Sequence, residues 1–332
     1  MLTQNNESLP NASTAALLTR KKDRLLAAVT LMFVVSVVAT SGVTQAAEGA
    51  FSHYLPASVD IFLALPPEPG FLAANTFWYQ SGSVGETVLD GRVDLDLDIS
   101  NFLNLTALTY TFGQSILGGR YTAGVLVPFG NVDLDATLIG PFGGRYPTSE
   151  SSFDISDIAL IPFQMNWATG PWSFKLSEVI VAPTGGYSES ELVNLGRNYW
   201  SFDTVTAVTW FDPEKGTELS IQPGLMINTK NSATDYLTGN EFHLDFTLNQ
   251  FLSPSFALGI RGYYYQQITG DSGSGAILGD YKSESFGAGP GFVWMPSVGD
   301  GQLSILGKWI HDFSAKNRFE SDYFTLAGAW KF

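Results

Sequence analysis

The sequence predicts an all-β protein, an antiparallel transmembrane β-barrel of about 12 strands with an irregular N-terminal segment. Three observations support this fold. Residues 322–332 alternate apolar side chains with polar or small ones at the period of two that a strand gives. The connections between strand-like runs alternate long and short. Beyond residue 43 no apolar run is long enough for a spanning helix, so any membrane insertion requires a closed barrel.

The last strand shows the pattern most clearly. One of its faces carries Phe324, Leu326, Trp330 and Phe332, and the other face is polar or small. This is typical of a strand between lipid and a wet lumen. The terminal aromatic resembles the closing strand of Gram-negative outer-membrane barrels. That resemblance implies that Phe332 is recognised by the outer-membrane assembly machinery.

Residues 1–47 predict a secretory signal peptide with a long n-region. A basic cluster ending at Arg24 precedes an apolar run over residues 25–38, and small residues up to Ala47 fit a cleavage site. The alternative is a single membrane-spanning helix, because residues 25–43 are nearly long enough to cross a bilayer.

Residues 48–69 predict an irregular segment. Pro66, Pro67 and Pro69 cannot occupy a central strand, and no alternation is sustained. Two interpretations stay open here: a plug in the periplasmic mouth of the barrel, or a flexible periplasmic tail. The barrel itself is predicted to occupy residues 70–332.

Twelve strand-like runs follow one another in this barrel region. They cover residues 71–80, 88–110, 119–138, 155–168, 172–182, 200–211, 218–227, 241–251, 255–268, 282–294, 302–311 and 323–332. Long connections are predicted at 139–154, 183–199, 228–240, 269–281 and 312–322, and short ones between them. Transmembrane barrels have short periplasmic turns and longer extracellular loops, so the long connections are expected outside the cell.

Composition excludes several classes of function. The chain has a formal net charge of −15, and nucleic acid is excluded as a partner because its binding depends on basic groups. With no cysteine there is no disulfide framework and no thiolate metal site. The 34 glycines and 14% aromatic residues fit tight turns and aromatic girdles.

Three carboxylates on one strand face are predicted to line the lumen. Asp94, Asp96 and Asp98 alternate with apolar residues and form a D-x-D-x-D run. A calcium loop would need Gly at its sixth position and Glu at its twelfth, where this chain has Ile99 and Leu105. A lumen wall is therefore the preferred interpretation, with Asp94, Asp96 and Asp98 supported by water or basic partners.

Further lumen residues are predicted from two other strands. His243 and Asp245 share a strand face, and Arg261 and Lys308 are candidate basic partners across the lumen. A hydrolytic dyad of His243 and Asp245 would also need a serine within hydrogen-bond reach, and spacing places none there. No enzymatic activity, metal or cofactor is predicted.

Tyr263, Tyr265 and Gln267 are predicted to face the lumen if Leu258 and Ile260 face lipid. Aromatic rings with polar tips could form a sliding surface for an aromatic solute. Ordinary girdle or packing tyrosines are the alternative.

Short runs spread over most of the chain carry a family resemblance. N-L-G-R-N-Y-W at 194–200 follows P-T-G at 183–185 and precedes T-D-Y-x-x-G at 234–239. Similar pieces are S-H-Y-L-P at 52–56, P-P-E-P-G at 66–70, G-G-R-Y at 118–121, and Y-Q-Q at 265–267 with Asp271. Together they resemble the SphA-like "MetA-pathway of phenol degradation" family of outer-membrane transporters. None of these runs is a catalytic signature.

The resemblance implies a protein of the bacterial outer membrane that admits small hydrophobic or aromatic compounds for catabolism. The predicted function is a passive channel in which lumen polarity and width set selectivity. Outer-membrane lipid, the solute and the assembly machinery are the predicted partners. The alternative is a structural or adhesive barrel whose long loops bind partners.

Overall fold

The computed structural model describes residues 52–332 except for 89–92, 140–143, 277–278, 281 and 299–300. The predicted signal peptide lies outside the described residues. In the described part, no helix has the length and apolar character needed to cross a membrane.

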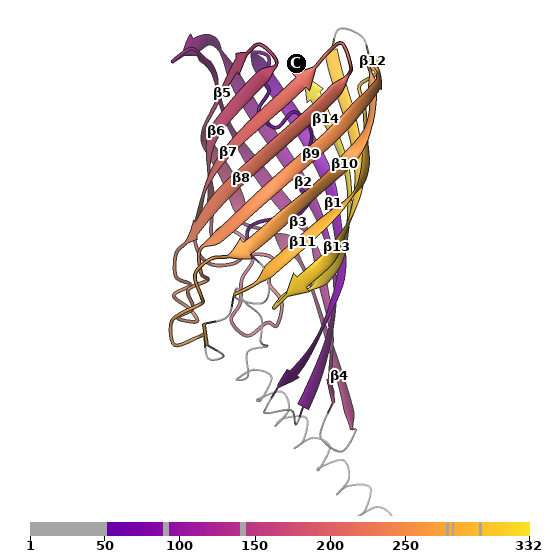
Figure 1. Cartoon of the computed structure of the whole chain (residues 1–332). Coiled ribbons are helices and arrows are strands. Elements are labelled where there is room, and N and C mark those ends of the chain that lie inside the picture. Colours follow the sequence, from indigo (N-terminus) through magenta and orange to yellow (C-terminus); the bar gives the residue numbers. More distant parts are fainter. Residues whose placement is uncertain (1–51, 89–92, 140–143, 277–278, 281, 299–300) are drawn as a thin grey trace, which may run out of the picture. The chain divides into compact units, whose positions relative to one another are not determined.

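Twelve strands close into one antiparallel barrel (Figure 1). The strand order closes because β1 pairs with β14 at one seam and β11 pairs with β13 at another. The predicted antiparallel barrel is thereby confirmed. In sheet order the twelve strands are β1 (Gly70–Val88), β2 (Val93–Ile116), β3 (Gly119–Ile139), β5 (Ile158–Thr169), β6 (Trp172–Ala182), β7 (Ser201–Asp212), β8 (Thr217–Asn228), β9 (Glu241–Ser253), β10 (Phe256–Gln267), β11 (Glu284–Trp294), β13 (Gly301–Lys316) and β14 (Glu320–Lys331).

Two described strands lie outside this ring. The two-residue β12 (Ser297–Val298) pairs with β13, and β4 (Arg145–Ile155) pairs with β3. The prediction of a long loop at 139–154 is wrong, because most of that stretch is β4. The inner half of β3 pairs with β5 and its outer half with β4. The outer half of β3 extends past β5, and β4 satisfies backbone groups that would otherwise form an open edge.

The predicted long connection at 312–322 is also wrong. β13 continues to Lys316 and β14 begins at Glu320, so only three residues join them. The other long connections lie at the end of the barrel opposite the C-terminus (Figure 1). Short turns mark the periplasmic end of outer-membrane barrels, so the long connections and the extended β1–β2 and β3–β4 hairpins are expected on the extracellular side.

Aromatic side chains form two bands on the outer face. Near the periplasmic end the rings of Phe71 and Tyr110 lie 4.7 Å apart. Toward the other end Tyr79 lies 6.3 Å from Phe324. The stretch of β1 from Phe71 to Tyr79 has the length of strand that spans a bilayer. These bands therefore mark the two membrane interfaces.

A charge placed on the lipid-facing wall should destabilise the barrel. Ile260 lies outward on β10 and is 53% exposed. Ile260→Arg is expected to lower the free energy of unfolding by about 2–4 kcal/mol, because it puts a guanidinium into hydrocarbon. Urea titration in lipid vesicles measures this. The control Ser83→Arg, on the outward side of β1 beyond the aromatic bands, should shift stability by less than about 0.5 kcal/mol.

Candidate functional site

Seven of the predicted lumen residues face the interior of the barrel. Every one of them is buried on the inner face of β9, β10 or β13; they are His243, Asp245, Arg261, Tyr263, Tyr265, Gln267 and Lys308. Leu258 and Ile260 lie outward on β10, as the alternation requires. Whether a solute contacts the seven residues stays a prediction.

The predicted lumen placement of Asp96 and Asp98 is wrong. Both are exposed and share the outer face of β2 with Phe102, whereas Leu97 and Ile99 are buried on the inner face. Asp96 also lies 3.6 Å from Arg145 of β4. The period of two was right but the faces were reversed. Outside the membrane the outer face meets water, so carboxylates are favourable there. The side chain of Asp94 lies outside the described part of β2.

The lumen contains the irregular segment that precedes β1. Tyr54 of this segment donates a hydrogen bond from its hydroxyl to Asp245 Oδ1 at 2.9 Å. The Tyr54 ring stacks on His243 at 4.4 Å and on Tyr265 at 5.5 Å between centroids. His243, Asp245 and Tyr265, which the alternation placed inward, therefore contact this segment rather than open water.

Further along, the segment is bound through its backbone. The N–H of Phe62 donates to Glu218 Oε1 at 3.1 Å, and the N–H of Ala64 donates to Thr209 Oγ1 at 3.0 Å. Asn166 Nδ2 donates to the carbonyl oxygen of Ala64 at 3.0 Å. An irregular chain has unpaired backbone groups, and buried ones need partners. The polar lumen wall supplies them from β5, β7 and β8.

Lys308 holds the middle of the segment from the opposite wall. Its ammonium donates to the carbonyl oxygen of Val59 and lies 3.3 Å from Asp60 Oδ1. Trp78 Nε1 of β1 donates to the carbonyl oxygen of Pro56 at 2.8 Å. The segment is thus bound on several sides of the barrel, and the predicted basic residue Lys308 finds its carboxylate partner in Asp60 rather than on another strand.

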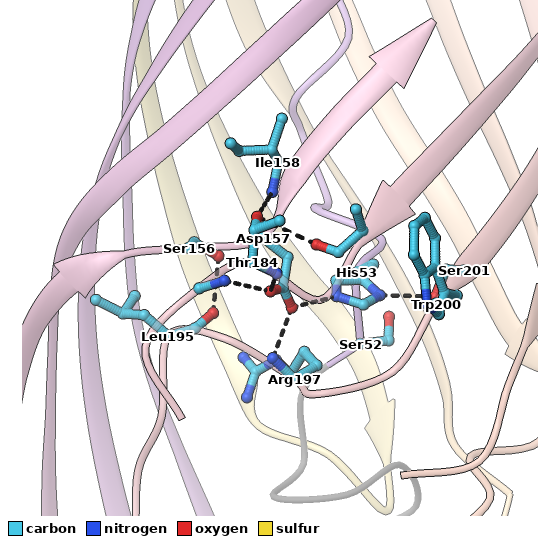
Figure 2. Close-up of polar contacts among 12 residues, drawn as sticks. Ser52, His53, Ser156, Asp157, Ile158, Thr184, Leu195, Arg197, Trp200 and Ser201 are labelled. Atoms are coloured by element: carbon cyan, nitrogen blue, oxygen red, sulfur yellow. Dashed lines mark hydrogen bonds and ion pairs between the residues drawn. The ribbon is translucent and has the colours of Figure 1, made fainter. Parts of the chain in front are cut away.

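The outer end of the segment is anchored at one buried carboxylate (Figure 2). His53 Nε2 lies 2.9 Å from Asp157 Oδ2, which precedes β5. Asp157 also accepts hydrogen bonds from the backbone N–H groups of Thr184 at 2.9 Å, Gly185 at 2.8 Å and Arg197 at 2.6 Å. One side chain thereby joins the N-terminal segment to the extracellular loop of residues 183–200.

Ser201 completes an arrangement that resembles a catalytic triad. Its Oγ lies 2.6 Å from His53 Nδ1, on the opposite side of the ring from Asp157. The same Oγ donates to Asn228 Oδ1 at 2.5 Å, which competes for the one hydroxyl proton. Ser201 has no exposed surface, and it does not line the cavity beside His53. A nucleophile needs room for its substrate, so the cluster serves as an anchor rather than as a hydrolytic site.

The anchor is expected to weaken in acid. Burial lowers the pKa of His53 below 6.5, and the charge of Arg197 adds to this against the opposing effect of Asp157. Burial alone would raise the pKa of Asp157, but hydrogen bonds from His53, Gly185 and Arg197 hold it below its usual value. His53 and Asp157 each stabilise the anchored segment in their less protonated form. Protonation therefore favours release of the segment from the anchor.

As the pH falls below about 6.5, the stabilisation from His53 is lost first, and that from Asp157 follows below about 3.8. The chain has no cysteine, so Ser58→Cys takes a single spin label on the segment. Its spectrum should show a mobile component that grows between pH 7 and 5. A His53→Gln protein should lack that change over the same interval. Equal pH dependence in both proteins would contradict the role given to His53.

Periodicity could not reveal this site. His53, Asp157 and Ser201 lie on three segments separated by 104 and 148 positions from His53, and only closure of the barrel brings them together. One signal was present in the sequence, the S-H-Y run at 52–54 within a stretch unsuited to a strand. Glu218 and Thr209 were missed because their strands carried no distinctive motif.

Comparison with known proteins places the chain in a family. Residues 80–327 match the model of the family described as "Putative MetA-pathway of phenol degradation". The chain belongs to this family. The resemblance seen in the sequence is confirmed by that match. The comparison with curated proteins gave no match.

Of three similar solved structures, one supports the fold of this family member. An outer membrane channel from Pseudomonas putida F1 matches with a TM-score of 0.64 at 16% identity, over 83% of this chain and 100% of that one. The transport unit of the autotransporter AIDA-I from Escherichia coli gives 0.41 at 12% identity, over 85% and 94%. A Pseudomonas aeruginosa FadL homologue gives 0.38 at 9% identity, over 79% and 90%. The first likeness supports the closed antiparallel β-barrel.

Proposed function

We propose that this family member is a passive outer-membrane channel for small hydrophobic or aromatic compounds, and that the segment before β1 narrows its lumen. The observation that carries the proposal is the closed barrel with an irregular segment bound inside it. A structural barrel has no need of a polar lumen partly filled by its own chain. The family description, which refers to phenol degradation, agrees with aromatic solutes.

The side chains inside the lumen favour slow, selective passage of a solute. Polar wall groups such as Glu218 are occupied by the segment's own backbone, so a hydrated solute finds few free partners. Aromatic faces remain beside the segment, with Phe62 packed against Phe211 and Phe251 at 5.1 and 5.6 Å between centroids. A solute with an aromatic body can exchange places with such faces at small cost. Sugars and other strongly hydrated molecules cannot.

Uptake by intact cells tests this function. Cells that produce the protein in their outer membrane should take up radiolabelled phenol faster than cells lacking it, while uptake of a hydrophilic sugar of similar mass stays the same. Initial rates at low concentration separate facilitated entry from leakage through lipid. Equal phenol uptake with and without the protein would contradict the proposal.

A further inference from the structure

Arg261, on the inner face of β10, is a buried cation without a hydrogen-bond partner. It is only 2% exposed, and in the part of the chain that the structure describes none of its three guanidinium nitrogens donates to an acceptor. A buried charge is costly unless it is paired and hydrogen-bonded. An anion that reached this guanidinium would therefore gain hydrogen bonds that the chain leaves unmade.

A second cation lies beside Arg261 on the wall of the lumen. β11 separates β10 from β13, and its residue Gly291 pairs with Lys308 of β13. A Cβ atom added to Gly291 would collide with Arg261 Nη1, so the guanidinium reaches the glycine that adjoins Lys308. The charges of Arg261 and Lys308 act on each other. The absence of a side chain at Gly291 thus brings two cations together.

The carboxylates near these cations leave Arg261 unpaired. Asp60 of the N-terminal segment and Glu218 of β8 are the two whose charges act on Arg261. Glu218 already accepts hydrogen bonds from the N–H of Phe62 and from two side chains of β9. Asp60 lies 3.3 Å from Lys308 Nζ, and its side chain is 46% exposed. Another carboxylate can therefore compete with Asp60 from the lumen.

An apolar patch adjoins the two cations. It consists of buried side chains from four neighbouring strands, β10, β11, β13 and β14: Ala257, Val293, Leu306 and Ala327. Val293 and Leu306 lie two positions along their strands from Gly291 and Lys308, and so they share the inner face with them. Positive charge and apolar surface therefore meet on one part of the wall.

Two consecutive residues of the segment occupy both parts of this site. Asp60 places its carboxylate beside Lys308, and Ile61 packs against the apolar patch. The ring of Phe251 also packs against the patch, so an aromatic body would find a ring to stack on. The segment thereby resembles a small molecule with a carboxylate and an apolar body. Unlike Asp60, a mobile carboxylate can also satisfy Arg261, because a guanidinium donates two parallel hydrogen bonds to a carboxylate.

We propose that Arg261, Lys308 and the adjoining patch bind the anion of a small aromatic carboxylic acid, which takes the place of Asp60 and Ile61. The nitrogens of Arg261 are covered in this structure, so the ligand first displaces the half-exposed Asp60 and reaches Arg261 as the segment moves. A ligand that binds only the displaced state shifts the population toward that state. The inference rests on the proposed channel function and adds an anionic class to the solutes that the channel admits.

Ligand-observed fluorine NMR with the full-length protein in a nonionic detergent tests the site. The probe is 4-fluorobenzoate, and 4-fluorobenzamide is the matched neutral ligand, which should bind more weakly. Arg261→Met should weaken binding of 4-fluorobenzoate about tenfold or more, because hydrogen bonds to a charged group are lost, and leave 4-fluorobenzamide unchanged. Arg120→Met makes the same substitution beside the short turn between β2 and β3 and should alter neither.

A change in the segment should have the opposite effect. Asp60→Asn removes the charge that competes with the ligand, so it should tighten binding of 4-fluorobenzoate several-fold. Glu68→Gln removes an exposed carboxylate from the same segment near Lys331 and should leave the affinity unchanged. Loss of structure cannot make a ligand bind more tightly, so this result separates a specific site from misfolding.

The proposal is overturned if wild-type protein does not bind 4-fluorobenzoate or binds both ligands equally. It is also overturned if Arg261→Met binds 4-fluorobenzoate as the wild type does, or if Asp60→Asn does not tighten binding. Phenol uptake without binding of 4-fluorobenzoate would overturn this site alone. Binding of 4-fluorobenzoate without phenol uptake would overturn the channel function alone.

Discussion

Deletion of residues 48–69 is expected to raise the single-channel conductance of the reconstituted protein several-fold. The segment is bound to the lumen wall through Tyr54, Phe62 and Ala64, and its removal leaves polar groups such as Asp245 and Glu218 in contact with water. Ions then meet a wide hydrated lumen in place of a filled one. Planar bilayer recordings of wild-type and deleted proteins measure the difference.

The deletion also separates the channel from the adhesive alternative. A barrel whose function lies in its extracellular loops has no reason to conduct more after this deletion. Heat-modifiability on gels must first show that the shortened chain still forms a barrel. Tyr54→Ala is the graded companion, because it removes the ring stacked on His243 and Tyr265 but keeps the rest of the segment. The conductance of the Tyr54→Ala protein should fall between those of the wild-type and the deleted proteins. Unchanged conductance in the deleted, folded protein would refute the placement of the segment.

Asp157→Ala should release the extracellular loop and the outer end of the segment together. The change removes the acceptor for three backbone N–H groups and for His53. Each backbone N–H group that loses its acceptor in this way costs about 1–3 kcal/mol. Backbone amides of Gly185 and Arg197 should therefore exchange with deuterium about 100 to 1,000 times faster or more, as measured by mass spectrometry of peptides from residues 183–200.

Asp154→Ala provides the matched control for this experiment. Asp154 is an exposed carboxylate three residues away, and its Oδ1 accepts a hydrogen bond from the N–H of Ile155. Its loss should change stability by less than about 0.5 kcal/mol. If Asp154→Ala loosens residues 183–200 as much as Asp157→Ala does, the loop is held by general packing near β4 and Asp157 has no special part in it.

Much of the fold followed from alternation and loop length, because lipid and lumen act on opposite faces of each strand. The inward placement of Tyr263 and Tyr265 needed only the period of two and one lipid-facing neighbour. The same rule failed for Asp96 and Asp98, since β2 continues past the membrane, where the outer face meets water and the inner face is packed. The period of two divides the residues of a strand between two faces, but it does not show which face contacts water.

The site was less accessible to sequence reasoning than the barrel. The segment before β1 has no periodicity, and its contacts with Glu218, Lys308 and Asp157 depend on where a closed barrel puts distant strands. Basic partners for Asp245 were sought on other strands, whereas the segment supplies Tyr54. A polar lumen wall predicts that polar groups fill the lumen. Composition alone does not show whether water or a segment of the chain supplies them.

Crosslinking of the segment to the wall tests the central claim most directly. Thr325 Oγ1 of β14 donates to the carbonyl oxygen of Ala57 at 3.3 Å, and the chain has no cysteine of its own. A protein carrying Ala57→Cys and Thr325→Cys, treated in isolated outer membranes with a short bismaleimide, should yield one linked peptide containing both positions. A partner pair of Ala57→Cys with Thr148→Cys on the extracellular β4 should yield none. Absence of the first link, or equal yields from the two pairs, would contradict a segment bound within the barrel.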